Sequence, residues 1–175
     1  AEVINAWVGE LGWHSVVEFG CGDGAQLELA EYPVYSGCDV SSTAIAQCEA
    51  RFAHDSTKSF QVHDATKDPA LVSVADVSLS LDVVYHLVED QIFEAYMAQL
   101  FDAAREAVVV YASNDERPQR VPHVRHRRFT DWVERQRPGW VLAERVPNRY
   151  PETLADGQQT SFADFYRYVR ATNAA

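Results

Sequence analysis

Glycines and acidic residues in the first half of the chain have the types and spacing of a ligand-binding site. The segment VVEFGCGDG places Glu18 two residues before Gly20, and Gly22 follows. Asp39 and Asp64 each end a short run of β-forming residues further along the chain. Glycine lets a backbone turn sharply and approach a ligand closely, and a carboxylate accepts hydrogen bonds from hydroxyl and amino groups. These residues predict a ligand site built on the ends of strands.

The glycine spacing does not define the ligand by itself. Gly20, Gly22 and Ala25 also satisfy the G-x-G-x-x-G/A pattern of dinucleotide-binding turns. Cys21 lies between the two glycines, where nothing nearby in the sequence is clearly placed to activate its thiol. We therefore expect Cys21 to contribute backbone contacts only.

His86, in the segment LSLDVVYHL, is the candidate catalytic residue. Imidazole takes up and releases protons near neutral pH, which suits a general base. The alternatives are that His86 packs at the start of the following helix or contacts a cofactor without proton transfer. The neighbouring Tyr85 is a candidate substrate contact, or simply a residue that lines the binding site without contacting the substrate specifically.

Basic residues gather in the second half of the chain. Nine of the 15 Lys and Arg residues lie between positions 117 and 149, where only three acidic residues occur. Guanidinium groups suit recognition of phosphate or carboxylate groups. The candidate substrate-binding residues are therefore Asn114, His123, Arg125, His126 and Arg127. The alternative is a solvated charged face, in which Arg128 and its neighbours pair with the acidic remainder of the protein.

Strand and helix signals alternate along the chain, as in doubly wound sheets. Strands are expected over residues 15–20, 34–40, 59–64, 75–81 and 107–111. Helices are expected over residues 3–11, 25–32, 42–52 and about 92–101, with Ser41 or Ser42 as the cap of the third and Asp131 as the cap of a later short helix. Residues 140–146 and 161–170 predict two closing strands joined by a turn over 148–159. Such sheets bind ligands at the carboxyl ends of their strands.

The combined pattern of VVEFGCGDG, Asp39, His63-Asp64-Ala65 and LSLDVVYHL resembles the class I S-adenosylmethionine-dependent methyltransferases over roughly residues 16–111. The resemblance implies an α/β, Rossmann-like doubly wound fold with a mainly parallel seven-stranded sheet and a C-terminal antiparallel hairpin. It also implies S-adenosyl-L-methionine as the cofactor. We expect one domain, 1–175, with a cofactor-binding half (1–111) and an acceptor-side loop and closing hairpin (112–175).

The resemblance also assigns the cofactor contacts. The glycine loop of the family lies against the methionine and ribose part of the cofactor, which corresponds here to Glu18, Gly20, Cys21 and Gly22. Asp39, with Val40 beside it, matches the acid that binds the ribose hydroxyls, and Asp64 and Ala65 match the adenine-binding position. The fourth motif of the family, beside the transferred methyl group, corresponds to Leu81, Asp82 and Val83.

Composition limits the partners. A formal net charge of −11 argues against a nucleic-acid partner, because phosphate binding draws on clustered Lys and Arg. No run approaches the roughly 18 apolar residues of a membrane span. The three cysteines lack zinc or disulfide spacing, so we expect no metal and a reducing, cytoplasmic location. The oligomeric state stays open.

The expected activity is methyl transfer to the oxygen or nitrogen of a small acceptor, which carries a phosphate or carboxylate group if the basic segment binds it. One alternative is a non-catalytic module that keeps the cofactor pocket. Another is an NAD-dependent oxidoreductase, although no Tyr-x-x-x-Lys pair follows the fourth strand.

Overall fold

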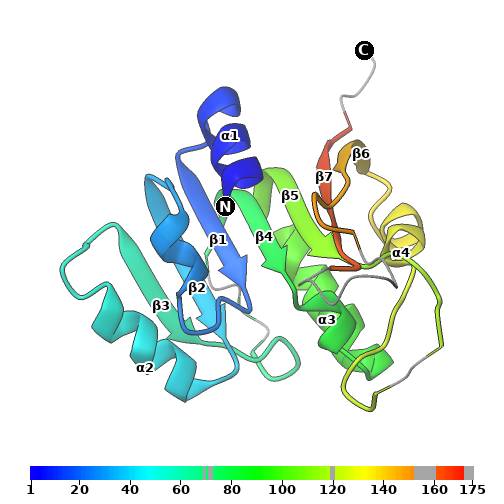
Figure 1. Ribbon diagram of the computed structural model, residues 1–175, viewed down its shortest axis with the longest axis horizontal. Coiled ribbons are helices and arrows are strands. Elements are labelled where there is room, and N and C mark those ends of the chain that lie inside the picture. The colour runs from blue at the N-terminus through cyan, green and yellow to red at the C-terminus, as the bar shows by residue number, and fades with distance from the viewer. Residues whose placement is uncertain (69, 71–72, 119–120, 152–160, 172–175) are drawn as a thin grey trace.

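Seven strands form one sheet in the order β3-β2-β1-β4-β5-β7-β6 (Figure 1). The computed structural model describes residues 1–68, 70, 73–118, 121–151 and 161–171. The strands are β1 (Ser15–Phe19), β2 (Val34–Asp39), β3 (Lys58–Val62), β4 (Ala75–Leu81), β5 (Ala104–Ala112), β6 (Trp140–Val146) and β7 (Asp164–Arg170). The first five run parallel, and β7 pairs antiparallel with both β5 and β6. The predicted doubly wound sheet with its C-terminal hairpin is confirmed.

Helices cover both faces of the sheet. They are α1 (Glu2–Leu11), α2 (Ser42–Arg51), α3 (Asp90–Asp102) and α4 (Phe129–Gln136), with short 3₁₀ turns at Gln26–Leu29 and Val84–His86. Residues of α3 and α4 pack with Val17 and Phe19 of β1 on one face, and α1 packs with Val16 on the other. Alternate β1 side chains thus enter two cores, which explains the nearly continuous apolar run.

Two helix predictions were wrong in detail. The segment 25–32 forms only the 3₁₀ turn Gln26–Leu29, because Gly24 and Pro33 confine it and Leu27 is its one buried residue within that turn. Asp131 does not cap α4. The cap position is Arg128, and the backbone N–H of Thr130 donates instead to Asn114 Oδ1, at 3.2 Å. The expected Ser41 cap of α2 is present, with its hydroxyl accepting from Ala44 N.

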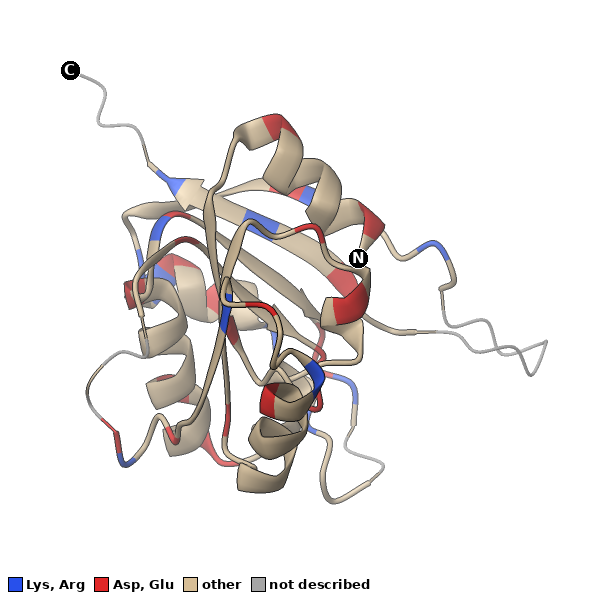
Figure 2. Cartoon of the chain, turned by 90° about the vertical axis from the view of Figure 1, so that its left-hand side faces the viewer, with Lys and Arg blue, Asp and Glu red and all other residues tan. Residues whose placement is uncertain are grey.

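The remaining boundaries agree closely with the sequence predictions. Of the predicted turn 148–159, residues 152–159 lie outside the described residues. Acidic positions are spread over helices, strands and loops alike (Figure 2). None of the helices in the described ranges is long and apolar enough to cross a bilayer.

The order of the sheet fixes where a ligand can bind. From β1 the chain passes to β2 and β3 on one side, and β4 and β5 then continue on the other. This reversal between β1 and β4 opens a crevice at the carboxyl ends of both strands. The turns that follow β1, β2, β3 and β4 carry the sequence-predicted cofactor residues to this edge.

Candidate cofactor and acceptor site

The turn after β1 is fastened to the end of β2. The backbone N–H groups of Gly20 and Cys21 both donate to the carbonyl oxygen of Cys38, at 2.7 and 3.0 Å. Gly20 has φ of 80°, and a Cβ at that position would lie 2.4 Å from a Val83 methyl carbon. Gly22 has φ of 57° and open space where a Cβ would stand. The first glycine is thus required by packing, while the second leaves the backbone exposed to a ligand.

Asp39 extends the same connection. Its Oδ2 accepts from the Gly22 N–H at 3.0 Å, and its Oδ1 accepts from the Ser41 N–H at 2.9 Å. Ser41, not Asp39, supplies the side-chain cap of α2. Each carboxylate oxygen of Asp39 keeps a second lone pair, and the side chain is half-buried. Asp39 can therefore accept hydrogen bonds from two neighbouring ligand hydroxyls.

Glu18 is the buried acid of the site. Its carboxyl is 7% exposed and accepts a hydrogen bond of 2.7 Å from the Tyr35 hydroxyl. Burial raises the pKa of Glu18 to about 7, against an ordinary value of 4.5, although the Tyr35 hydrogen bond lowers it. The protonation of this group consequently changes in the physiological range.

The turn after β3 presents Asp64 and Ala65. Lys67 Nζ and both the N–H and the hydroxyl of Thr66 donate to Asp64, and these contacts hold its pKa well below the usual range. Gln99 on α3 anchors the turn, because its amide donates to the carbonyl oxygens of Ala65 and Asp68 and its Oε1 lies 2.6 Å from His63 Nε2. Asp64 is therefore ionised and fixed in place.

Asp82 follows β4 in an unusual conformation. It is the one non-glycine residue among those described with a positive φ, 60°. Such a conformation costs about 1–3 kcal/mol and is found mainly at functional sites. The Asp82 N–H donates to the Tyr111 carbonyl, and the Tyr85 hydroxyl donates to Asp82 Oδ1 at 2.6 Å.

Two cavities meet at this edge of the sheet. The first, of about 180 Å³, is lined on its apolar side by Val40, Ala65, Val83, Leu87 and Ile92, with Asp39 and Asp64 also on its wall. The second, of about 420 Å³, is lined by residues that include Glu18, Cys21, Gly22, Leu81, Tyr111 and Phe165. Gly20 and Asp82 line both. The structure thus brings all the predicted cofactor residues into two adjoining cavities.

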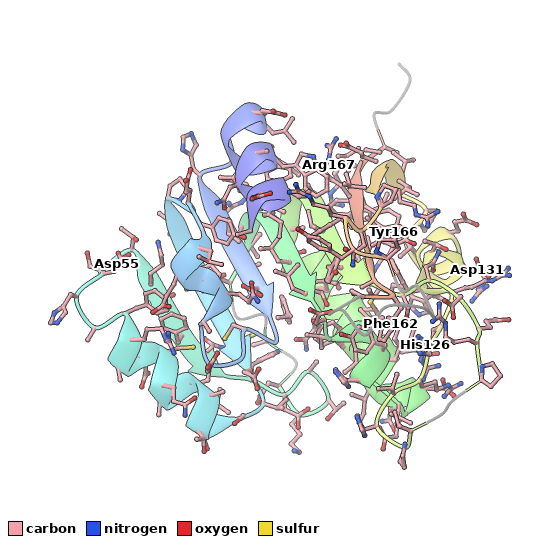
Figure 3. All side chains as sticks on the ribbon, viewed as in Figure 1. Asp55, His126, Asp131, Phe162, Tyr166 and Arg167 are labelled. Atoms are coloured by element: carbon pink, nitrogen blue, oxygen red, sulfur yellow. The ribbon has the colours of Figure 1, made fainter. Side chains whose placement is uncertain are left out.

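Tyr85, His86 and His126 form a cluster of rings beside Asp82. The Tyr85 ring centroid lies 4.6 Å from that of His86 and 4.9 Å from that of Phe162. Phe162 lies against His126, 4.8 Å away (Figure 3). The exposed His86 has its Nδ1 3.0 Å from the carbonyl oxygen of His123. This contact requires a proton on Nδ1, so neutral His86 has its lone pair on Nε2.

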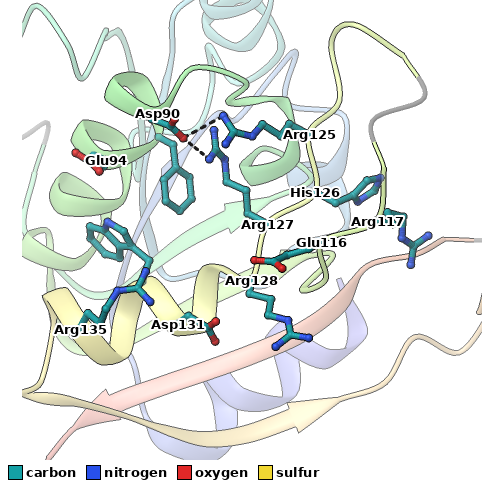
Figure 4. A pocket seen from close by; sticks show the side chains of 12 residues that line it. Asp90, Glu94, Glu116, Arg117, Arg125, His126, Arg127, Arg128, Asp131 and Arg135 are labelled. Carbon is teal, nitrogen blue, oxygen red and sulfur yellow. Dashed lines mark hydrogen bonds and ion pairs between the residues drawn. The ribbon is translucent and has the colours of Figure 1, made fainter.

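The side chains of two predicted substrate-binding arginines, Arg125 and Arg127, contact the start of α3 rather than this ring cluster. Arg125 and Arg127 both pair with Asp90 (Figure 4). Both also donate to the Val88 carbonyl oxygen. Arg127 also stacks on the Phe93 ring, 4.8 Å from its centroid. Together these contacts fasten the basic segment to the start of α3. The two arginines point into a separate cavity of about 510 Å³.

This third cavity, the α4 cavity, contains Arg128 of the predicted basic segment and Arg135, which was not predicted as a site residue. Its walls include Glu94, Glu116, Arg128, Asp131 and Arg135, and also His126, whose ring centroid lies 6.4 Å from that of Tyr85. In the described part of the chain, neither Arg128 nor Arg135 has a side-chain hydrogen bond or ion pair. Arg128 occupies the cap position of α4 and Arg135 lies in its last turn. This spacing of seven residues places both on one side of the helix and is the signal that could have identified them.

Two other residues differ in role from the expectation or were missed. Asn114 bonds Thr130 at the start of α4 through both its oxygen and its nitrogen, so its amide is used within the protein. Tyr111 was missed, although it ends the apolar strand β5 next to Asp82. Its hydroxyl accepts from Asn148 Nδ2 and donates to Ser161 Oγ, at 2.8 and 3.0 Å. No group of three or more His, Cys, Asp or Glu within the described ranges is placed to hold a metal ion.

Comparison with known proteins gives a consistent result. A family described as "Methyltransferase domain" matches residues 16–107, and the chain belongs to the class I S-adenosylmethionine-dependent methyltransferases. The NAD-dependent alternative is thereby excluded. No curated protein matches the sequence.

Solved structures share the fold. N-methyltransferase NodS from Bradyrhizobium japonicum WM9 has 16% identity and a TM-score of 0.74, over 98% of this chain and 93% of NodS. Magnesium protoporphyrin IX methyltransferase ChlM from Synechocystis PCC 6803, with bound SAH, has 17% identity and a TM-score of 0.73, over 97% and 81%. The methyltransferase domain of bacterial CtHen1-C has 17% identity and a TM-score of 0.73, over 98% and 96%.

The two adjoining cavities fit S-adenosylmethionine, the methyl donor of this family. Apolar side chains of Ala65 and Val83 suit the faces of a purine, and Asp39 suits a ribose diol. The open space beside Gly22 leaves room for close backbone approach. The carboxyl of Glu18 suits a cationic amino group once it is ionised.

Glu18→Gln tests the burial of this acid through the pH dependence of stability. Because the folded pKa is raised to about 7, the protonated form is favoured by folding, and its contribution is present below about pH 4.5 and lost as pH rises through 7. Glutamine imitates the protonated carboxyl. We therefore expect the melting temperature of the variant, relative to wild type, to rise between pH 5 and pH 8, measured by thermal unfolding without ligand.

Glu49→Gln, on the exposed side of α2, is the matched control and should show no such trend. A difference for Glu18→Gln that stays constant between pH 5 and pH 8 would contradict the raised pKa.

Proposed function

We propose that this enzyme transfers the methyl group of S-adenosylmethionine to an oxygen or nitrogen atom of a small acceptor that also carries an anionic group. The observation that supports this most directly is the meeting of two cavities at Gly20 and Asp82, on the switch-point edge of the sheet. The acceptor then enters beside Asp82, Tyr85 and Tyr111.

The protein's part in such a reaction is mainly to position the reactants. S-adenosylmethionine supplies a methyl group on a positively charged sulfur, which a nucleophile attacks in line. Val83 and Ala65 bind the purine, Asp39 binds the ribose hydroxyls, and Glu18 binds the amino-acid end. Rigid placement of this kind contributes a large share of the rate in a two-substrate displacement.

Two groups beside the ring cluster are able to take up the acceptor's proton. His86 presents a basic Nε2 because His123 holds a proton on Nδ1, and it lines the first cavity only. Asp82 presents a carboxylate that lines both cavities. A general base is required for a hydroxyl acceptor and less so for an amine that is already neutral.

The α4 cavity is the proposed place for the acceptor's anionic group. Arg125 and Arg127 are already engaged with Asp90, so the cations that an incoming phosphate or carboxylate meets first are Arg128 and Arg135. The rings of Phe93 and Trp132 offer apolar surface beside them. His126, which lines this cavity, has its ring centroid 6.4 Å from that of Tyr85, and the His123 ring lies 6.0 Å from His86.

We place the reaction in the cytoplasm. Cys21, Cys38 and Cys48 are free thiols.

Burial, the largest cause, raises the pKa of Cys21 far above its ordinary value, so its sulfur stays protonated and unreactive. This agrees with a backbone role for Cys21 in the turn.

Asp39→Ala tests cofactor binding. Loss of a charged acceptor whose hydrogen bonds are worth roughly 1.5–3 kcal/mol should weaken S-adenosylhomocysteine binding by more than tenfold in calorimetry. Glu49→Ala, on the exposed side of α2 and outside both cavities, is the control and should change the affinity by less than threefold. A folded Asp39→Ala variant with wild-type affinity would refute the assignment of the ribose acid, and tight binding of NAD⁺ by the wild type would refute the function.

Arg128→Gln tests the anion site without knowledge of the acceptor. Phenyl phosphate combines a phosphate with a ring, and its binding to the wild type is measured by NMR titration. We expect the variant to bind it at least fivefold more weakly and the wild type to bind it more weakly as salt rises, because exposed charges are screened. Arg51→Gln, which removes a cation paired with Glu28 on another part of the surface, should bind like wild type. Equal binding by all three proteins would leave no role for Arg128 in anion recognition.

A further inference from the structure

Asp82 occupies the point where the two cofactor cavities join. The first cavity carries the purine-binding surface of Ala65 and Val83, and the second carries Glu18 and the glycine turn. In S-adenosylmethionine the sulfur lies between the ribose and the amino-acid end. A ligand that fills both cavities therefore carries its sulfur, and the methyl group on it, past the residues common to both, which are Gly20 and Asp82.

The backbone at Asp82 is held in a conformation that L-amino acids rarely adopt. Its φ of 60° is fixed by the N–H bond to the Tyr111 carbonyl, at 3.0 Å. Strain of this kind persists only where the surrounding structure imposes it, and it is concentrated at functional sites. Here it places a carboxylate at the end of β4, where the side chain is exposed to the cavities rather than packed.

Only one oxygen of the Asp82 carboxylate is engaged within the described part of the chain. Oδ1 accepts the Tyr85 hydroxyl at 2.6 Å, and Phe162 and His126 pack against the Tyr85 ring. Tyr85 is 8% exposed, so this donor cannot swing away easily. Oδ2 has no partner among the described residues and remains available to a ligand.

Three other polar side chains near the junction already hold hydrogen bonds within the protein. The carboxyl of Glu18 is buried against Tyr35, and both oxygens of Asp39 accept backbone N–H groups. The Tyr111 hydroxyl both donates and accepts within the protein.

We propose that Asp82 binds the N–H or O–H group of the acceptor beside the transferred methyl and takes its proton, with Tyr85 as the positioning residue. This inference rests on the proposed function. It narrows the acceptor to an amine or a hydroxyl, because a carboxylate at this point repels a nucleophile that is itself a carboxylate or phosphate oxygen. An amine that binds as a cation must first give a proton to Asp82, since only the neutral amine has a lone pair with which to attack. The acceptor's anionic group must then lie away from the reacting atom, as the separate α4 cavity allows.

The reaction balances with these groups alone. A lone pair of the acceptor nitrogen or oxygen forms the new bond to the methyl carbon, and the methyl–sulfur bond breaks with its electron pair left on sulfur. The proton that the acceptor loses passes to Asp82 Oδ2 and from there to solvent.

The test compares two ligands that need no acceptor. S-adenosylhomocysteine has no group at the methyl position, whereas sinefungin carries a C–NH₃⁺ group in place of the methyl-sulfonium. If Asp82 faces that position, the wild type binds sinefungin more tightly than S-adenosylhomocysteine in calorimetry at pH 7. Asp82→Asn should weaken sinefungin at least tenfold and S-adenosylhomocysteine less than threefold.

Matched variants separate the possible outcomes. Glu49→Gln removes an exposed carboxylate of α2 that lines neither cavity and should keep the preference for sinefungin, as should His86→Gln. Asp82→Gly adopts the positive φ without strain, and it should lose the preference in the same way as Asp82→Asn. It keeps the test valid if the asparagine variant folds poorly.

An unchanged ratio of the two affinities in Asp82→Asn and Asp82→Gly overturns the proposal while the proposed function stands. Loss of the ratio in His86→Gln alone also overturns it, in favour of His86. A wild type that binds neither ligand refutes the proposed function, and the role of Asp82 with it.

Discussion

The binding edge of this protein depends on how the turn after β1 is tied to the end of β2. Cys38 accepts two backbone N–H groups of the turn through its carbonyl oxygen, and Asp39 accepts a third through its side chain. The turn can come this close only because Gly20 has no Cβ to collide with Val83. These hydrogen bonds join the turn after β1 to the turn after β2, and the close approach of Gly20 to Val83 joins it to the turn after β4. The shapes of both cofactor cavities therefore depend on them.

A second set of contacts, made by α3, also holds the turns of the binding edge in place. The Tyr96 hydroxyl on α3 donates to the Phe19 carbonyl, immediately before the glycine turn, and bonds the Ser80 hydroxyl on β4. Gln99, one turn further along α3, holds the turn after β3. One helix thus positions three of the four turns that form the site.

The acids of the site have different functions because their surroundings differ. Glu18 is buried against a tyrosine and titrates near neutrality, whereas Asp64 is ionised by its lysine and threonine partners. Asp82 is exposed, strained and partly free. Similar residue types at the ends of neighbouring strands can therefore bind the cofactor, order a loop or meet the acceptor.

Local patterns in the sequence were sufficient for the sheet and for the cofactor residues. Runs of β-formers marked every strand, and the acids at their ends came together because the ends of parallel strands share one edge. The helical propensity of residues 25–32 misled, because Gly24 and Pro33 bound the segment and Leu27 is the one residue of the 3₁₀ turn that is buried, so little packing stabilises a longer helix. The partners of Arg125 and Arg127 could not be found in this way, since Asp90 lies more than thirty residues away along the chain. The Tyr85 bond to Asp82 spans only three residues and was within reach of spacing arguments.

A crystal structure with S-adenosylhomocysteine tests the central claim most directly, because it asks whether the two adjoining cavities are one cofactor site. The account predicts the purine between Ala65 and Val83, the ribose on Asp39, the amino-acid end beside Glu18, and the sulfur next to Asp82. A ligand confined to one cavity, reversed across the junction, or bound in the α4 cavity would contradict it.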